Sequence, residues 1–557
     1  MGELTSGFLE PKFLLGLGPN QFPRQVERLL WHLGFTDVTN IDGPGDEGGD
    51  LLGDYNGHHW TLQCKWKKSG TVGAAAVDEV ARARDAYRAT RAAVVTNTQL
   101  SAGAIRRVDQ LALLAPRIQL WPGLTLNRAF AKVPDRFAAI RLRPYQEDAR
   151  TALDTTLQET RRGLLILATG LGKTVVSGEI IANHLHRLPH DQVLVVAHTK
   201  DLVDQLERAL WRHLDKHTKT RLLTGDERPD DLDGVTCATL ASALYAARRG
   251  YRPGLVVVDE AHHVGEDGQY SELLDLLTES QQMGVTATPW RGDEYDISRR
   301  FGPAAFTLGI EEGMRNGYLA QVDYRLFIDN IDWDIVRNAS QHSYSLGELN
   351  SKLFLPQRDE AIRDELASVW GHVPNPRAIV FCRTVQHAER LADLLRRNAR
   401  WGNALAVHAA LTKRERQSRL LAFRAGHVPI LTSVDILNEG VDVPDVNILC
   451  FARVTHSRRI FVQQLGRGLR LRDGKERVIV LDFVSDLRRV AAALNIKREL
   501  EASETETLNR LDGSRVEFSD QRVGSLMNEW IQDAASLETA YDESRLQFPD
   551  PSAIPGW

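Results

Sequence analysis

The chain has 557 residues, of which 43% are hydrophobic and 26% are charged, and its formal net charge is −5. This length exceeds one hydrophobic core, because a domain usually holds about 100–200 residues, and the composition is that of an ordinary soluble globular protein. The charge excludes a generally polycationic nucleic-acid binder, and no run of about 20 apolar residues predicts a membrane span, so we expect a cytoplasmic protein without a membrane partner.

Residues 1–125 have the pattern of a compact α/β domain. The expected elements, in chain order, are a helix at 22–33, a Gly/Asp-rich turn, strands at 49–52 and 60–66, a helix at 74–90 and a strand at 92–96. The pattern breaks at Trp121-Pro122-Gly123, and we assign residues 126–140 to a linker.

The two short strands of this domain carry an acid and a Gln-x-Lys pair. Asp50 opens the first strand, and Gln63 and Lys65 lie near the end of the second. Antiparallel pairing would gather the three side chains, so that Asp50 and the Gln63 amide oxygen bind Mg²⁺ and Lys65 stabilises or deprotonates a water. Phosphodiester cleavage suits this geometry. The alternative is that Asp50 serves its turn and Lys65 is a solvated strand end.

Two later blocks alternate apolar strands with helical segments, which predicts parallel sheets covered on both faces. The first block is residues 141–305, with strands expected at 164–167, 193–197, 255–258 and 283–286. The second is residues 376–490, with strands expected at 378–382, 430–432, 448–451 and 478–483. We therefore predict two lobes, a connector at 306–375 and an acidic extension at 491–557.

Residues 168–174, ATGLGKT, follow a strand and open a helix. Gly170 and Gly172 allow a tight turn whose N–H groups face phosphates, Lys173 supplies positive charge to them, and Thr174 offers a hydroxyl to Mg²⁺. A strict P-loop has glycine where this chain has Leu167, so the loop alone is a weak match.

Residues 255–263, LVVVDEAHH, supply the complementary acids. Asp259 closes the strand and would complete the magnesium shell, which leaves Glu260 to orient and deprotonate water. The loop and the acids together predict ATP hydrolysis.

The order of motifs from 141 to 485 resembles a superfamily 2 helicase of the DEAH type, closest to the motor subunits of type I and type III restriction enzymes. Residues 143–146, 197–205, 236–242 and 286–289 resemble the adenine-side motif and motifs Ia, Ib and III, and residues 379–384, 434–442 and 463–470 resemble motifs IV, V and VI. The resemblance implies two RecA-like lobes with ATP in the cleft between them.

The resemblance also implies roles for individual residues. Gln146, Gly440 and Asp442 would bind the nucleotide, and Arg467 and Arg470 would stabilise charge on the γ-phosphate. Coupling or DNA contact is implied for His262, Thr286, Thr288, Thr239, Arg383 and Gln463. Motif V opens with Val434 where many relatives have threonine, and we expect Thr432 or Ser433 to supply the missing hydroxyl.

Asp50, Gln63 and Lys65 resemble the Mrr-type branch of the PD-(D/E)xK nucleases, in which Gln replaces the usual second acid. The resemblance implies a restriction-endonuclease-like α/β fold for this domain. The helix at 22–33 resembles the family's first helix, which would bring Glu27 into the metal shell, and Mn²⁺ is an alternative to Mg²⁺ at this site.

These patterns predict an ATP-dependent DNA helicase or translocase coupled to a Mg²⁺-dependent endonuclease of prokaryotic restriction or anti-phage defence. Its partner would be double-stranded or branched DNA, with other defence proteins as further candidates. One alternative is a repair or recombination helicase-nuclease. Another is a translocase or sensor whose N-terminal domain binds DNA without cutting it. The four cysteines are far apart and mostly inside apolar runs, so we expect buried thiols.

Overall fold

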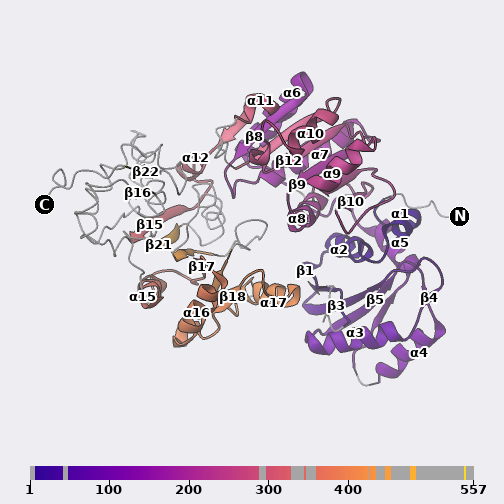
Figure 1. The fold of residues 1–557 in the computed structure, drawn as a ribbon. Helices are drawn as coiled ribbons and strands as arrows, with labels where there is room; N and C mark the ends of the chain where they lie inside the picture. Colours follow the sequence, from indigo (N-terminus) through magenta and orange to yellow (C-terminus); the bar gives the residue numbers. More distant parts are fainter. Residues whose placement is uncertain are drawn as a thin grey trace, which may run out of the picture. The chain divides into compact units, whose positions relative to one another are not determined.

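A computed structural model of the chain describes residues 7–41, 48–113, 115–138, 140–287, 296–327, 344–345, 359–424, 426–434, 446–452, 477–483 and 545–546. The chain divides into two compact units, one of residues 1–166, 172–289 and 295–307, the other of residues 167–171, 290–294 and 308–557. The first unit holds the N-terminal domain together with most of the first lobe, and the second unit contains the second lobe (Figure 1).

The N-terminal domain is built on a five-stranded sheet in the order β1-β2-β3-β5-β7. The strands β1, β2 and β3 are antiparallel, and β5 and β7 continue the sheet in parallel with β3. Their bounds are β1 Thr36–Asn40, β2 Leu51–Tyr55, β3 His58–Lys65, β5 Arg91–Thr96 and β7 Gln119–Trp121, and a separate pair joins β4 Thr71–Val72 to β6 Gln99–Leu100. The predicted antiparallel pairing of the two short strands is confirmed.

The register of β2 on β3 is set by the turn that joins them. Asn56 and Gly57 have φ angles of 50° and 73°, the positive values that a two-residue hairpin with the right twist requires. Leu51 then faces Leu62 across the pair. This register brings the start of β2, just after Asp50, beside the end of β3.

Helices cover both faces of this sheet (Figure 1). The apolar residues of α2 (Phe22–His32) pack in one core with Trp60, Leu62 and Cys64 of β3, joined by α1 (Pro11–Leu17) and α5 (Gly123–Lys132). A second core joins α3 (Ala75–Ala86) and α4 (Ala102–Leu111) to β5. Because side chains alternate along a strand, Gln63 and Lys65 point to the α3 face.

Helix α5 begins before residue 126, inside the region that the sequence assigns to the domain, and continues through the first part of the predicted linker. Its Leu126 and Phe130 are buried in the same core as α2. The helix therefore belongs with the N-terminal domain.

The first lobe has a seven-stranded sheet in the order β10-β11-β9-β12-β13-β8-β14. Neighbouring strands from β10 to β8 are parallel, as predicted. The strands are β8 Arg162–Leu167, β9 Val193–Ala197, β10 Thr220–Leu223, β11 Val235–Thr239, β12 Leu255–Asp259, β13 Gln281–Thr286 and β14 Ala304–Leu308. The helices are α6 Pro144–Thr160, α7 Lys173–Arg187, α8 Lys200–Trp211, α9 Leu240–Arg248, α10 Gln269–Leu276 and α11 Ser298–Phe301, with a 3₁₀ turn at Ala261–His263.

The second lobe has a six-stranded parallel sheet in the order β15-β21-β20-β17-β19-β18. Its strands are β15 Gln321–Phe327, β17 Ala378–Cys382, β18 Leu405–Val407, β19 Ile430–Ser433, β20 Ile448–Ala452 and β21 Arg477–Phe483. The helices of this unit are α12 Ile310–Arg315, α15 Asp359–Trp370, α16 Val385–Arg396 and α17 Lys413–Arg424, with a 3₁₀ turn at Ala399–Trp401, and a short pair joins β16 Tyr344–Ser345 to β22 Arg545–Leu546.

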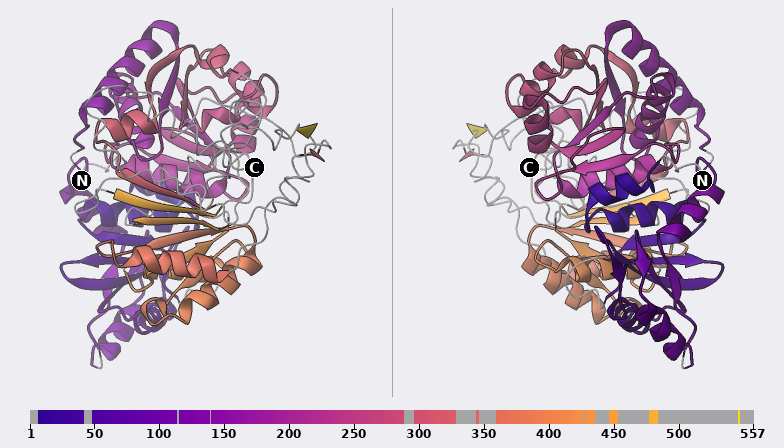
Figure 2. Two further views of the ribbon diagram at one scale, coloured as in Figure 1. Left: turned by 90° about the vertical axis from the view of Figure 1, so that its left-hand side faces the viewer. Right: turned by 90° about the vertical axis from the view of Figure 1, so that its right-hand side faces the viewer.

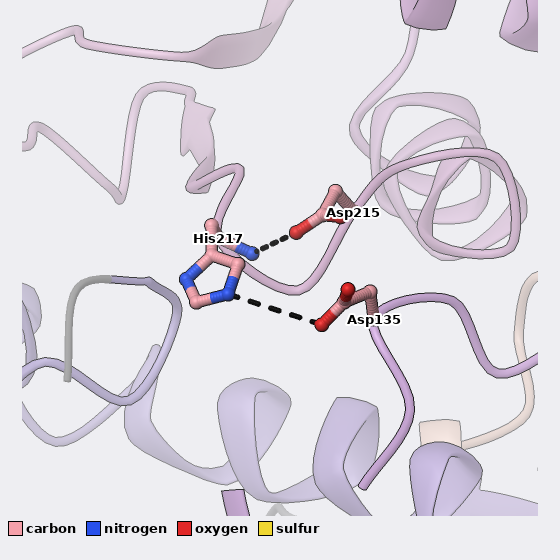
Figure 3. Close-up of side chains that lie close together, drawn as sticks. All are labelled: Asp135, Asp215 and His217. Carbon is pink, nitrogen blue, oxygen red and sulfur yellow. Dashed lines mark hydrogen bonds and ion pairs between the residues drawn. The ribbon is translucent and has the colours of Figure 1, made fainter. Parts of the chain in front are cut away.

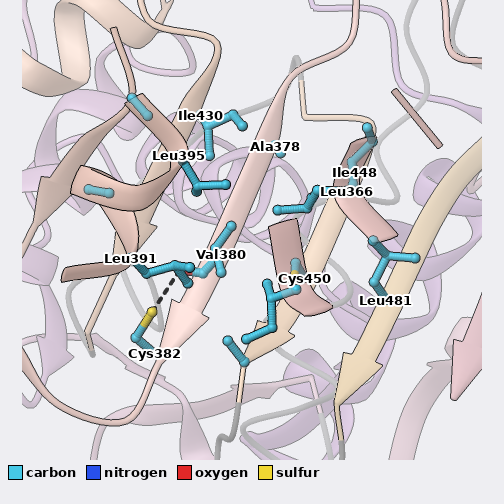
Figure 4. Packing of buried hydrophobic residues seen from close by; sticks show 14 of the residues in the cluster. Leu366, Ala378, Val380, Cys382, Leu391, Leu395, Ile430, Ile448, Cys450 and Leu481 are labelled. Carbon is cyan, nitrogen blue, oxygen red and sulfur yellow. Dashed lines mark hydrogen bonds between the residues drawn. The ribbon is translucent and has the colours of Figure 1, made fainter. Parts of the chain in front are cut away.

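Part of the predicted connector belongs to this second lobe. Strand β15 pairs with β21 over its whole length, and Ile362 and Leu366 of α15 lie in the lobe's apolar core (Figure 4). Cys382 and Cys450 are buried in the same core, and all four cysteines are free and buried, as expected. Within the described part of the chain, no helix combines the length and apolarity that a bilayer crossing requires.

The N-terminal domain contacts the first lobe through charged side chains of α2 and α8. Figures 1 and 2 draw the ribbons of this unit from three sides. Arg24 donates from Nε to Glu207 at 2.9 Å and also contacts Asp204. One turn further along α2, Glu27 accepts from Nε of Arg208 at 2.7 Å. Arg24, Glu27 and Glu207 are at most 5% exposed, so the Arg24–Glu207 pair is buried, whereas Arg208 and Asp204 are 30% and 32% exposed.

Arg28 closes the same contact against the loop that follows α8. Its guanidinium donates to the carbonyl oxygens of Thr218 and Asp215 at 2.8 and 3.0 Å and lies 4.4 Å from the Phe8 ring centre. Complete burial lowers the pKa of Arg28 to about 9. Burial of the Arg28 charge is unfavourable, and the two carbonyl oxygens and the Phe8 ring offset this cost.

We predict that the Arg24–Glu207 pair couples the two domains energetically. Removing one partner leaves a buried charge without compensation, which costs about 3–5 kcal/mol of unfolding free energy. A double-mutant cycle of Arg24→Ala and Glu207→Ala, followed by denaturant unfolding, measures the interaction.

The matched control is the exposed pair Arg248–Glu272, whose side chains are 58% and 44% exposed and 2.5 Å apart. Solvent screening should hold its coupling below about 1 kcal/mol. Equal coupling energies for the two pairs would contradict the burial argument.

Candidate ATPase and nuclease sites

The glycine-rich loop needs both of its glycines for steric reasons. Gly170 and Gly172 have φ angles of 94° and 89°, and Gly172 caps the N-terminus of α7. A Cβ atom on Gly172 would lie 2.5 Å from Nε2 of Gln146. Leu167, where a strict P-loop has glycine, is fully buried at the end of β8.

Gln146, predicted to contact the adenine, links this loop to the start of α6. Its Oε1 accepts from the Arg143 backbone N–H at 3.0 Å and closes the helix N-terminus. The side chain is buried, and its amide lies against Gly172. The adenine-side motif and the phosphate loop are therefore in contact.

The predicted acids lie beside the loop lysine. Nζ of Lys173 is 3.3 Å from Oε1 of Glu260, and both side chains are largely buried. Asp259 is partly buried at the end of β12, and desolvation together with the negative charge of Glu260 raises its pKa to about 7, which Lys173 partly opposes. Glu260 adopts φ 49°, a left-handed conformation that turns the chain sharply after the strand.

This donor set fits a divalent cation. The carboxylates of Asp259 and Glu260 together with the ammonium of Lys173 carry a net charge of about −1, which a cation would neutralise. Oxygen donors are also the ligands that Mg²⁺ prefers. The ion would be held by Asp259 at the end of β12 and by Thr174 in the first turn of α7. When bound, Mg²⁺ would draw charge from the phosphates.

His262 connects the acids to the end of β13. Its Nδ1 forms a hydrogen bond with Oγ1 of Thr286 at 2.9 Å and lies 3.3 Å from Oε2 of Glu260. His262 and Thr286 are both buried. The contacts therefore run from Lys173 through Glu260 and His262 to Thr286, the residue that opens the motif III segment.

The predicted DNA-contact residues of motifs Ib, IV and V have different surroundings. Thr239 precedes α9 and donates to Oγ of Ser242 at 3.1 Å. Arg383 is exposed just after β17. Thr288, Gly440, Asp442, Gln463, Arg467 and Arg470 lie outside the described residues.

The prediction that Thr432 contacts nucleic acid is wrong. Thr432 is completely buried, and its hydroxyl donates to the Ala388 carbonyl oxygen at 2.8 Å inside the second lobe. Ser433 is also completely buried. Val434 packs in the lobe's apolar core, which explains the absence of threonine at this position.

The nuclease residues come together in the N-terminal domain. Oδ2 of Asp50 accepts hydrogen bonds from Nε2 of Gln63 at 2.8 Å and from the Cys64 backbone N–H at 2.5 Å. Asp50 and Gln63 are each 4% exposed. Oε1 of Gln63 is buried and has no hydrogen-bond partner in the described part of the chain. An orphaned buried amide oxygen beside a carboxylate fits a divalent cation.

Lys65 has a partner that the sequence patterns did not reveal. Its Nζ lies 2.6 Å from Oε2 of Glu79, in the middle of α3. Glu79 lies within the predicted helix at 74–90. The alternation of side chains along the strand predicts the face on which Lys65 lies, but it does not predict which turn of the helix is opposite Lys65. The apolar residues Val77 and Val80 beside Glu79 in the sequence indicate that this turn of the helix packs near the sheet, and both are buried there.

Glu27 is not brought to this group. It lies on α2, which packs on the face of the sheet opposite to Gln63 and Lys65, and its carboxylate pairs with Arg208. The predicted role of Glu27 in the metal shell is therefore wrong, because the helix turns this side chain toward the first lobe.

Asp135, Asp215 and His217 form a further cluster of candidate metal ligands (Figure 3). His217 donates its backbone N–H to Asp215 at 2.8 Å, and its Nε2 lies 3.9 Å from Asp135. Nζ of Lys216 lies 3.3 Å from the same oxygen of Asp135 and already supplies positive charge. We assign this cluster to the contact between the N-terminal domain and the first lobe.

Three family models match the chain in the same order as these domains. Residues 14–130 match a restriction endonuclease model, residues 139–291 match the res subunit of type III restriction enzymes, and residues 357–472 match the helicase conserved C-terminal domain. The chain carries superfamily 2 helicase domains behind an Mrr-type restriction-endonuclease domain. The Mrr-type and helicase resemblances predicted from the sequence are confirmed.

Individual relatives of this chain are distant in sequence. It is 28% identical to irc3 of Schizosaccharomyces pombe, which is named as a mitochondrial ATP-dependent helicase, over 67% of the chain and 61% of irc3. It is 27% identical to the DNA 3′-5′ translocase XPB2 of Sulfurisphaera tokodaii, over 61% of the chain and 81% of XPB2. The chain thus spans less than two thirds of the length of irc3.

The structure of the Type ISP restriction-modification enzyme LlaBIII bound to DNA shares the fold. The superposition covers 96% of this chain and 43% of the LlaBIII chain, with 16% sequence identity and a TM-score of 0.50.

We predict that Glu260→Gln leaves ATP bound but slows its hydrolysis. The amide cannot take a proton from water, and loss of a general base costs about 10²–10⁴-fold in rate. Steady-state ATPase assays and nucleotide binding measure the two effects. Glu266→Gln, an exposed acid in the next loop, is the control and should hydrolyse ATP at the parental rate. Parental turnover by Glu260→Gln would exclude the assigned role.

Proposed function

We propose that this protein is an ATP-dependent DNA helicase or translocase coupled to a Mg²⁺-dependent DNA endonuclease of prokaryotic restriction or anti-phage defence. The observation that carries the cutting function is the buried Asp50–Gln63 hydrogen bond with Lys65 two residues further along the strand. Burial of the Gln63 amide oxygen without a hydrogen-bond partner in the described residues lowers stability, a cost that a domain serving only to bind DNA would not need to bear. The N-terminal domain and the first lobe each match a family of restriction enzymes, which favours a role in defence over a role in repair.

The chemistry assigned to each residue follows from its position. Asp50 and Oε1 of Gln63 would hold Mg²⁺, which stabilises charge on the scissile phosphate. Lys65 places a positive charge beside the attacking water. Water attacks phosphorus, the bond to the leaving 3′ or 5′ oxygen breaks, and that oxygen takes up a proton. Mn²⁺, which also accepts oxygen ligands, could replace Mg²⁺.

The ATPase residues would supply directed movement along DNA. Lys173 binds the phosphates, Asp259 binds the metal, and Glu260 activates water, while His262 and Thr286 carry the state of this site to motif III. The resemblance to motif VI assigns Arg467 and Arg470 to stabilisation of charge on the γ-phosphate. Of the two relatives described above, one is named as an ATP-dependent helicase and the other as a DNA translocase, which supports DNA over RNA as the track.

The contact between α2 and α8 supports coupling of the two activities. Thr199 caps α8 and belongs to motif Ia, which contacts nucleic acid in the helicases that this chain resembles. Near the other end of the same helix, Glu207 and Arg208 hold the nuclease domain. DNA bound at motif Ia would therefore lie at a fixed separation from the nuclease.

The test is cleavage of supercoiled plasmid with Mg²⁺, with and without ATP, on methylated and unmodified DNA. We expect Lys65→Ala to lose cleavage and keep DNA-stimulated ATPase, and Lys173→Ala to lose the ATPase. Lys68→Ala, an exposed neighbour of Lys65, is the matched control and should cut normally.

The outcomes separate the competing functions. Cleavage by Lys65→Ala at the parental rate would refute the nuclease site, and absence of cleavage by the parent with intact ATPase would favour a sensor that only binds DNA. Preference for branched or single-stranded DNA, without discrimination by methylation, would favour a repair helicase-nuclease.

A further inference from the structure

Lys65 forms an ion pair with Glu79, a carboxylate that the predicted nuclease motif does not include. Nζ of Lys65 and Oε2 of Glu79 are 2.6 Å apart, and the two side chains are 34% and 30% exposed. The pair is therefore partly open to solvent, although Oε2 of Glu79 is itself buried, and Lys65 lies two residues along β3 from the buried Gln63.

The position of Glu79 is fixed by its own helix and by the turn before Asp50. Val77 and Val80 on either side of Glu79 are completely buried in the core beneath α3. Gly48 has φ 85°, and a Cβ atom on it would lie 2.7 Å from Cβ of Glu79 and 2.9 Å from its Cα. The Gly48-Gly49-Asp50 turn thus packs directly on the backbone of Glu79.

Charge balance gives this carboxylate a chemical role. Gln63 is neutral, so Asp50 and Lys65 alone sum to zero, and Glu79 restores one net negative charge to the group. A lysine side chain also has about 2 kcal/mol of rotamer entropy, so an unpartnered Lys65 would sample many positions. An ion pair with a rigidly held helix residue restricts it to one of them.

We propose that Glu79 is the positioning residue of the nuclease site and holds the Lys65 ammonium beside Asp50 and Gln63. This inference rests on the proposed nuclease function. Glu79 acts through Lys65 and does not take part in bond making or breaking. When the scissile phosphate binds, Lys65 keeps its contact with Glu79 and presents its remaining N–H donors to the phosphate and the water.

The test is single-turnover cleavage of plasmid DNA by the full-length protein in Mg²⁺. Misplacement of a reacting group by about 1 Å costs about 10²-fold in rate, so we expect a loss of that order for Glu79→Ala and Glu79→Gln. Glu79→Asp keeps the charge on a shorter side chain and should recover part of the rate. DNA affinity and DNA-stimulated ATPase should stay at parental values, which reports an intact fold.

The same helix offers a matched control. Asp78 pairs with Arg107 of α4 at 2.7 Å, with side chains 38% and 39% exposed, so Asp78→Ala removes an equivalent ion pair from the neighbouring position. Asp78→Ala should cut at the parental rate.

Three results would overturn the inference while Lys65→Ala remains inactive. They are cleavage by Glu79→Ala within twofold of the parent, equal losses for Asp78→Ala and Glu79→Ala, and parental cleavage by Glu79→Gln, which keeps the shape without the charge. If Lys65→Ala itself cuts normally, the nuclease assignment fails instead, so the two failures are distinguishable.

Discussion

The structure of the first unit depends on a buried electrostatic contact between two helices. Arg24 of α2 pairs with Glu207 of α8, and Glu27 of α2 pairs with Arg208 of α8. Each guanidinium therefore has a carboxylate partner on the other helix. Thr220 also donates to Glu207 at 2.6 Å, which satisfies its second oxygen. Such a contact specifies one docking geometry, because any shift along the helices leaves a buried charge unpaired. The nuclease domain and the first lobe consequently form one compact unit.

The ATPase site follows from the order of three parallel strands. Strands β12, β13 and β8 are adjacent, and their carboxyl ends meet at one edge of the sheet. Lys173 follows β8, Asp259 ends β12 and Thr286 ends β13, so residues that are far apart in the chain become neighbours. Desolvation, together with repulsion from Glu260, raises the pKa of Asp259, and this is the cost of keeping two acids together for a cation.

The nuclease site obeys a different constraint, the alternation of side chains along β3. Trp60, Leu62 and Cys64 face α2 and form the core, which turns Gln63 and Lys65 to the other face. That face is covered by α3, and the glycine turn before Asp50 fits only because it has no side chain to meet the helix. The site is therefore enclosed by a strand and a helix that are adjacent in the fold.

The sequence by itself determined the three-domain order, the parallel sheets of both lobes and the identity of the loop, acid and Gln-x-Lys motifs. Those features are local, because strand periodicity, glycine spacing and the chemistry of a turn are properties of short segments. The pairing of Asp50 with Gln63 was also accessible, since hairpin neighbours are close in sequence.

Only the tertiary structure decided which helical faces meet. It turned Glu27 away from the metal site toward Arg208, brought Glu79 to Lys65, and withdrew Thr432 into the second lobe. It also added β15 and α15 from the connector to the second lobe, because strand pairing with β21 and burial of Ile362 join segments more than a hundred residues apart in the sequence. The rotation of a helix and its partner depend on packing against distant residues, and no local pattern encodes them.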